Sequence, residues 1–142
     1  MIRKASAIWK GDLKSGAGTL ATETGVLKNT QYSFASRFET GAGTNPEELI
    51  GAAHAGCFSM ALSGALTAAG FAPEQIATTA NVHIDKVDTG FKVTLIELST
   101  EARVPNIDDA KFQEIAAGTK TGCPISQALA ATEIKLTAKL LK

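Results

Sequence analysis

A long stretch without charged side chains, residues 49–69, constrains the fold of this chain most strongly. It contains no Asp, Glu, Lys or Arg, and roughly twenty such residues are enough to cross a bilayer as a helix. Its side chains are mostly Ala, Gly and Ser, however, and acidic residues flank it instead of basic or aromatic anchors. We therefore expect no membrane span but a buried helix, covered on every side by a sheet or by a second chain.

Start and stop signals frame this helix. Asn45 is a favourable N-cap, Pro46 suits the first helical position, and Glu48 stands where a capping box requires an acid. Gly70 follows the last apolar residues and predicts the end of the helix. The sequence thus predicts one helix from about residue 46 to about residue 69.

Three β-prone runs separated by turn residues precede the helix, and they predict three strands: SAIW, GAGTLATETG and QYSFASRFE. In the third run, side chains should alternate between the two faces of a strand. This alternation predicts that Arg37 lies on the face opposite the aromatic side chains of Tyr32, Phe34 and Phe38.

The segments after the helix continue the pattern of separate strands and helices. Two β-rich segments around Asp88-Thr89-Gly90 predict an antiparallel hairpin. A surface helix is expected after Pro105, a short helix after Cys123-Pro124, and a last strand that closes the sheet. Because strands and helices are segregated, we expect an α+β fold, with residues 1–142 forming a single domain.

Charge excludes several classes of partner. The chain has 14 basic and 14 acidic residues and no block of like charge, so nothing predicts binding to nucleic acid or to a membrane surface. The beginning of the chain, MIRKASAIWKGD, lacks the apolar core and cleavage site of a secretory signal, which leads us to expect a cytoplasmic protein. Its two cysteines would normally be reduced there.

The two cysteines are the first candidates for chemistry. Cys57 falls inside the long helix, where a free cysteine is often only a small apolar side chain. Cys123 precedes Pro124 at a helix start, where backbone N–H groups favour a thiolate. The cysteines stand 66 positions apart and form neither a CxxC pair nor, with two scattered histidines, a zinc pattern. We therefore expect no metal site. Any bond between the two cysteines would be long-range, which favours redox chemistry.

Three further residues could act with Cys57. Ten helical residues separate Glu47 from Cys57 by about 15 Å along the axis, so this acid cannot act directly on the thiol of its own helix. Either it acts through an intermediate such as Arg37, or Arg37 and Glu47 reach the cysteine of a second subunit. His54, three residues before Cys57, neighbours it on the helix surface and leaves a Cys/His nucleophile pair open.

Several stretches together resemble the OsmC/Ohr family of bacterial thiol peroxidases, the osmotically inducible and organic hydroperoxide resistance proteins. They are AIWKGDLKSGAGTLATETGVL, YSFASRFE, GTNPEELIGAAHAGCFSMALS and GTKTGCPISQAL, and the resemblance covers essentially the whole chain. The arginine of SRFE is similar to that of the OsmC branch, whereas the Ohr branch has it in an earlier glycine-rich turn.

This resemblance implies roles for four residues. Cys57 would be the peroxidatic cysteine, Cys123 the resolving cysteine, Arg37 the active-site arginine and Glu47 its acidic partner. It also implies an intertwined homodimer in which antiparallel sheets wrap long central helices, with both active sites at the subunit interface. No bound cofactor is implied, and an external dithiol, such as a lipoyl-type dithiol, would be the reductant.

The function expected from these roles is thiol-dependent reduction of organic hydroperoxides, and more weakly of hydrogen peroxide, through a Cys57 sulfenic acid and a Cys57–Cys123 disulfide. Apolar side chains near the site should favour bulky peroxides, and the candidates are Phe38, Phe58, Met60 and Ile125. Two alternatives remain open: a non-catalytic redox-sensing or stress-binding protein that uses the same cysteine pair, and a Cys57/His54 hydrolase.

Overall fold

The computed structural model describes residues 1–142 and divides into two compact units, residues 1–49 and residues 50–142. Each unit is described by itself below. The observed architecture is α+β, as the sequence predicts. The expectation of one domain over the whole chain stays a prediction.

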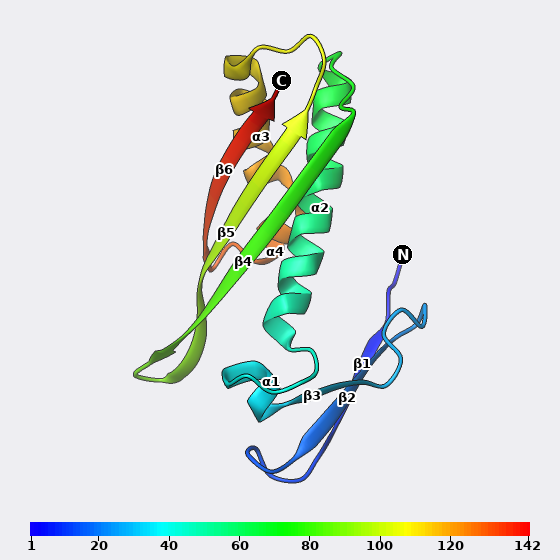
Figure 1. Ribbon diagram of the computed structural model, residues 1–142, viewed down its shortest axis with the longest axis vertical. Coiled ribbons are helices and arrows are strands. Elements are labelled where there is room, and N and C mark those ends of the chain that lie inside the picture. The colour runs from blue at the N-terminus through cyan, green and yellow to red at the C-terminus, as the bar shows by residue number, and fades with distance from the viewer. The chain divides into compact units, whose positions relative to one another are not determined.

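The first unit contains a three-stranded antiparallel sheet in the order β1-β2-β3, followed by a single helical turn (Figure 1). All six residues of its edge strand β1 are exposed, so this strand contributes no buried face within the chain. The elements of this unit are β1 (Ala5–Lys10), β2 (Ala17–Thr22), β3 (Thr30–Ser33) and α1 (Phe34–Phe38).

The prediction of a strand over QYSFASRFE is wrong for the second half of this run. The strand stops at Ser33, and the residues that follow form the turn α1. The Ser33 hydroxyl accepts a hydrogen bond from the Ser36 backbone N–H at 3.1 Å, and the Ser36 hydroxyl accepts one from the Ser33 N–H at 2.9 Å. This capping box starts a helix where the alternation suggested a strand. Arg37 consequently lies beside Phe38 instead of across a sheet from it, with its guanidinium carbon 5.0 Å from the ring centroid.

The long helix α2 (Pro46–Ala68) forms where the sequence predicts it. Asn45 Oδ1 accepts a hydrogen bond from the Glu48 backbone N–H at 2.8 Å, which confirms the N-cap. The Glu48 carboxylate accepts a hydrogen bond from the Thr44 hydroxyl. In a capping box it would instead accept one from the Asn45 backbone N–H. Past the other end of the helix, Gly70 has a φ of 91°, a conformation that favours glycine and ends the helix.

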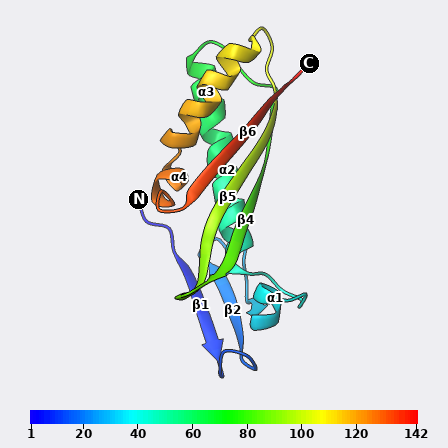
Figure 2. The same ribbon diagram turned by 90° about the vertical axis from the view of Figure 1, so that its left-hand side faces the viewer.

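The second unit contains a sheet in the order β4-β5-β6, with β4 antiparallel and β6 parallel to the central strand β5. The hairpin around Asp88-Thr89 and the closing strand are confirmed. The helices of this unit cover one face of the sheet (Figures 1 and 2). Its elements after α2 are β4 (Gln75–Val87), β5 (Gly90–Arg103), α3 (Asp109–Gly122), α4 (Pro124–Ala128) and β6 (Glu133–Leu141).

The core of this unit lies between α2, β5 and α3. Buried side chains recur every four residues along α2 and meet buried side chains of β5 and α3, as helix-on-sheet packing requires. Cys123 belongs to this core and is fully buried. The cluster is Phe58, Leu62, Leu66, Leu98, Ala102, Val104, Phe112, Ala116 and Cys123.

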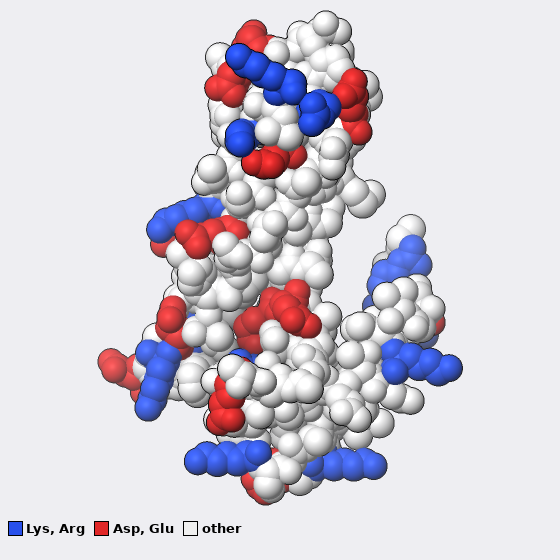
Figure 3. Space-filling model, viewed as in Figure 1, with Lys and Arg blue, Asp and Glu red and all other residues white.

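The opposite side of α2 is exposed in this chain. Its residues also recur every four positions, and all but one are small: Ala52, Gly56, Met60, Gly64 and Ala68. A Cβ at Gly56 or Gly64 would meet nothing within 4 Å. Figure 3 shows white, uncharged atoms along the helix beyond its first turn. The chain itself therefore covers one side of α2.

By length and composition, α2 is also the one helix that could cross a membrane. In its most apolar window, 28% of the residues are buried within the chain. The core helix of a soluble protein meets the same two criteria, so they carry little weight alone. The expectation that the chain does not enter a membrane stays a prediction.

Truncating the core at Leu62 should destabilise the protein strongly. Leu62→Ala removes a fully buried side chain and should lower the free energy of unfolding by about 2–5 kcal/mol. Leu13→Ala, at an exposed leucine, is the matched control and should change it by less than about 0.5 kcal/mol. Urea unfolding at fixed protein concentration measures both. Equal losses for the two variants would contradict the core described here.

Candidate active site

Arg37 and Glu47 form a close ion pair within the first unit. Arg37 Nε donates to both carboxylate oxygens of Glu47, at 3.0 and 3.1 Å, and Nη2 donates to Oε1 at 2.6 Å. Glu47 is buried, whereas the Arg37 side chain is 38% exposed. These three hydrogen bonds hold the guanidinium plane and use Nε and Nη2, so Nη1 remains for another acceptor.

A small polar network sets the position of this ion pair. The Ser36 hydroxyl donates to the Thr44 carbonyl at 2.8 Å, and Asn45 Nδ2 donates to the Ser36 carbonyl at 3.3 Å. These bonds tie α1 to the residues that begin α2. Gly43 makes the connecting turn with a φ of 112°, where a Cβ would lie 2.6 Å from the Gln31 carbonyl oxygen. The loop therefore requires glycine at this position.

An apolar pocket of about 220 Å³ lies beside Arg37 in the same unit. Four aromatic side chains contribute to its wall, and their rings form two pairs. The ring centroids of Trp9 and Tyr32 lie 5.3 Å apart, and those of Phe34 and Phe38 lie 4.9 Å apart. Of the predicted substrate-binding residues, Phe38 lines this pocket. The sequence did not predict the other lining residues as a group, because they come from β1, the turn after it, β3 and α1. The lining residues are Trp9, Leu13, Tyr32, Ser33, Phe34, Arg37 and Phe38.

Cys57 and Cys123 meet within the second unit. Their sulfurs lie 2.9 Å apart, within hydrogen-bond distance of each other, and both cysteines are free. Cys57 comes from the middle of α2, and Cys123 from the break between α3 and α4 that Gly122 and Pro124 flank. The structure therefore brings together the two cysteines that the sequence separates by 66 positions.

The surroundings affect the two thiols in opposite ways. Burial, together with the hydrogen bond to Cys123, raises the pKa of Cys57 above its ordinary value. Burial alone would also raise the pKa of Cys123. Hydrogen bonds from Cys57, from the backbone and hydroxyl of Ser126 and from the Ile125 backbone outweigh it, so the pKa of Cys123 is lowered. Within its own unit, Cys123 is the more readily ionised thiol.

His54 does not pair with Cys57. It is fully buried, and its Nε2 lies 2.8 Å from the hydroxyl oxygen of Ser126 on α4. Its Nδ1 is buried without a hydrogen-bond partner. No sequence signal pointed to Ser126, which is 72 positions away. The structure thus assigns His54 to the surroundings of Cys123.

The remaining predicted substrate-binding residues lie in different surroundings. Phe58 is fully buried in the core of the second unit, which favours a packing role. Met60 is 78% exposed on the uncovered side of α2. Ile125, next to Cys123 in α4, is partly buried against the core. Their proposed contacts with substrate stay predictions.

Two other features of the chain bear on possible sites. No group of three or more His, Cys, Asp or Glu residues is placed to hold a metal ion, and the expectation of no metal stays a prediction.

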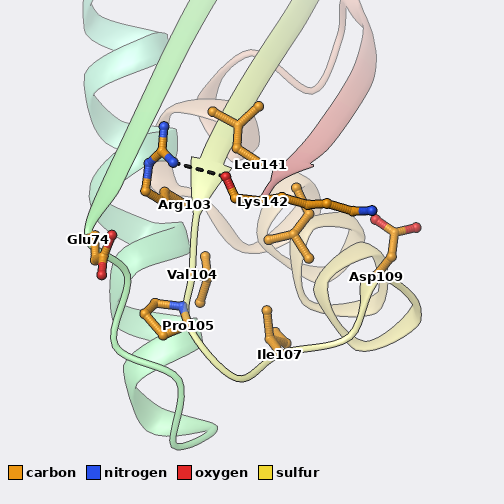
Figure 4. Close-up of a pocket in the computed structure, with 9 residues that line it drawn as sticks. Glu74, Arg103, Val104, Pro105, Ile107, Asp109, Leu141 and Lys142 are labelled. Carbon is orange, nitrogen blue, oxygen red and sulfur yellow. Dashed lines mark hydrogen bonds between the residues drawn. The ribbon is translucent and has the colours of Figure 1, made fainter.

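A larger pocket, of about 770 Å³, lies in the second unit beside the last residues of β6 (Figure 4). Glu74, Arg103 and Asp109 line it without a cysteine, so it is separate from the thiol pair.

The fold and the close pair of thiols define a two-cysteine α+β protein, and comparisons with known proteins name its family. Residues 39–139 match the family model of the OsmC-like proteins. The chain belongs to the OsmC-like family. Arg37 lies two positions before the matched segment, whereas Glu47 and both cysteines lie inside it.

Relatives and solved structures agree with this assignment. The chain is 57% identical to "Peroxiredoxin OsmC" of Escherichia coli (strain K12), over 91% of this chain and 90% of that protein. It is 30% identical to "Organic hydroperoxide resistance protein OhrB" of Bacillus subtilis (strain 168), over 79% and 81% of the two chains. The crystal structure of an OsmC-like protein from Mycoplasma pneumoniae, 16% identical, shares the fold with a TM-score of 0.76 over 100% of this chain and 99% of that one.

Mild oxidation should link the two cysteines within one chain. Because the sulfurs lie 2.9 Å apart, a thiol oxidant such as diamide should produce a Cys57–Cys123 disulfide without rearrangement of α2 or α4. Peptide mapping by mass spectrometry under non-reducing conditions detects the link, and Cys123→Ser is the control that cannot form it. Two free thiols, or a link only between chains, would contradict the observed contact.

Proposed function

We propose that this protein is a thiol-dependent peroxidase that reduces organic hydroperoxides, and hydrogen peroxide more weakly, to alcohols and water. The observation that carries the proposal is the close contact of Cys57, which is half-buried, with the fully buried Cys123. The names of the relatives, a peroxiredoxin and an organic hydroperoxide resistance protein, support the same reaction class.

In the first step, the Cys57 thiolate attacks one peroxide oxygen. The O–O bond breaks, the alkoxide leaves and takes up a proton to become the alcohol, and Cys57 becomes a sulfenic acid. In the second step, the Cys123 thiolate attacks the sulfenic sulfur. Hydroxide leaves and is protonated to water, and the Cys57–Cys123 disulfide remains.

The first step requires a cation near Cys57. Because burial and Cys123 raise the pKa of this thiol, its own unit does not make it a good nucleophile at neutral pH. Arg37 is the cation we propose for this role. Its guanidinium is oriented by the buried Glu47 and retains Nη1, so it could stabilise both the thiolate and the departing oxygen.

Organic substrates would be preferred because of the pocket beside Arg37. Its wall of Trp9, Tyr32, Phe34 and Phe38 offers apolar surface for an organic tail, and burial of such a tail is favourable by about 25 cal/mol per Å². Hydrogen peroxide has no tail to bury. We propose Phe38 as a substrate contact on this ground.

A dithiol from outside the protein would complete the cycle. It would reduce the Cys57–Cys123 disulfide in two exchange steps and leave as a disulfide itself, so we propose no bound cofactor. A lipoyl-type dithiol suits this role because its two thiols can close a ring when oxidised. We also propose that the protein acts in the cytoplasm, where such reductants keep cysteines reduced.

We further propose that the protein is a homodimer. The exposed stripe of small side chains along α2 permits close approach of another helix, and every residue of β1 is exposed. A second copy would cover both. In such a dimer, Arg37 and Glu47 can serve the Cys57 of either the same chain or the partner chain.

Two alternatives make different predictions. A Cys57/His54 hydrolase would require His54 to activate Cys57, but the His54 Nε2 lies against Ser126. A redox sensor or stress-binding protein would use the same disulfide but react only once. Turnover with excess dithiol separates this second alternative from a peroxidase.

Substitutions at the proposed site should affect the peroxidase cycle in distinct ways. With cumene hydroperoxide and excess dithiol, Cys57→Ser should abolish peroxide consumption. Cys123→Ser should still form a sulfenic acid at Cys57 but no disulfide. Arg37→Gln should slow oxidation of Cys57 about a hundredfold, because it removes the charge that stabilises the reacting oxygen and sulfur.

Arg103→Gln is the matched control, since Arg103 is exposed and donates to the Lys142 carbonyl. It should react as the parent protein does, as followed by loss of peroxide. Consumption of a single equivalent of peroxide, even with dithiol in excess, would contradict the peroxidase and favour the sensor.

A further inference from the structure

His54 is a buried polar residue for which the proposed cycle has no use. It is fully buried on α2, and its Nε2 lies 2.8 Å from the hydroxyl oxygen of Ser126, which is also buried. The other ring nitrogen, Nδ1, has no hydrogen-bond partner. A buried ring with one unsatisfied nitrogen costs free energy that an apolar side chain would not cost. The bond to Ser126 therefore calls for a physical reason.

This bond joins the same two segments as the contact between the sulfurs. On α2, Cys57 stands three residues after His54, and side chains at this spacing are neighbours on a helix. On the other segment, Cys123 is the N-cap of α4 and Ser126 is its third helical residue. His54 bonds to Ser126, and Cys57 contacts Cys123 at 2.9 Å. The two segments are thus linked at two adjacent points.

Little else of a directional kind holds α4 in place. This helix is five residues long, and backbone hydrogen bonds join its ends to nearby residues, as from the Gln127 N–H to the Cys123 carbonyl at 3.0 Å. Ile125 packs against the core, but apolar contacts are non-directional. The bond between His54 and Ser126 is the one hydrogen bond that a side chain of α4 makes to another element. It therefore sets the position of α4 along α2.

We propose that His54 is a positioning residue for the disulfide: its hydrogen bond to Ser126 holds α4, and with it Cys123, at the place on α2 where the two sulfurs can bond. Both partners are buried, so neither could bond to water instead, and the hydrogen bond should resist breaking. Fixing the two thiols side by side raises the effective concentration of one for the other. The bond therefore favours the disulfide over two separate thiols.

The proposal concerns the thiol pair in two reactions. In exchange with an oxidised dithiol, the two cysteines lose two electrons and two protons, and the S–S bond of the dithiol is reduced to two thiols. In the peroxidase cycle, the Cys123 thiolate attacks the sulfenic sulfur of Cys57, and hydroxide leaves and is protonated to water. The second reaction rests on the proposed peroxidase function. The first does not, because it requires no peroxide.

The exchange equilibrium tests the proposal in the full-length protein. The protein is equilibrated with mixtures of oxidised and reduced dithiothreitol and quenched with acid, and the disulfide fraction is measured by thiol labelling and mass spectrometry. His54→Leu should lower the equilibrium constant for disulfide formation about fivefold, the effect of losing one hydrogen bond. Ser126→Ala should lower it similarly. The double variant should lower it no further than the larger single effect, because both changes break the same bond.

Two further variants separate positioning from stability. The longer amide side chain of His54→Gln can reach the place of Nε2 and can either donate or accept, so it should keep the parent constant. Ser59→Ala is the matched control: Ser59 lies two residues after Cys57 on α2, and its hydroxyl donates to Thr78 at 2.8 Å and does not reach α4. This variant should lower the free energy of unfolding in urea but leave the exchange constant unchanged.

The outcomes are distinct even if His54→Leu fails to fold. A folded Ser126→Ala protein with the parent constant would overturn the proposal. So would a loss in Ser59→Ala as large as that in Ser126→Ala, because the effect would then reflect stability in general. In concentrated denaturant all variants should share one constant, and differences that persist there would also contradict the proposal. A lowered constant in a protein without peroxidase turnover would uphold the positioning role and reject the peroxidase.

Discussion

The contact between the sulfurs of Cys57 and Cys123 is the interaction on which the rest of the structure depends. It exists because α2 packs its buried side against the β4-β5-β6 sheet and because the chain breaks between α3 and α4 at Cys123. Both thiols are thereby placed in or against a packed core. A core of this kind resists movement, so the two sulfurs can bond without a large rearrangement.

Burial creates an electrostatic problem that two different parts of the chain address. Two thiols in an apolar setting favour their neutral forms, yet each step of the proposed cycle needs one of them as a thiolate. For Cys123, hydrogen bonds within its own unit outweigh burial and lower its pKa. For Cys57 that unit supplies no cation, and we propose Arg37, oriented by Glu47, for this purpose. Each sulfur would then have its own source of stabilisation.

The sequence predicts most of this fold because local signals specify it. The Asn45-Pro46 start, the Gly70 end and the Asp88-Thr89 hairpin are all formed as expected. The turn α1 was missed because a run of alternating side chains also fits a strand, and the serine pair that caps it is recognisable only once the backbone turns. The parallel pairing of β6 with β5 and the contact of His54 with Ser126 join distant positions. No local pattern encodes such contacts. The proximity of the two cysteines likewise followed only from the family resemblance.

The central claim is that the Arg37 guanidinium keeps Cys57 ionised, and thiolate titration tests it most directly. In a Cys123→Ser background, the absorbance of the Cys57 thiolate is followed against pH, with and without Arg37→Gln. The account predicts a midpoint below neutral pH with Arg37 and a clear rise when the charge is removed. A midpoint that is the same in both proteins would show that Arg37 does not act on this sulfur, and would contradict the account.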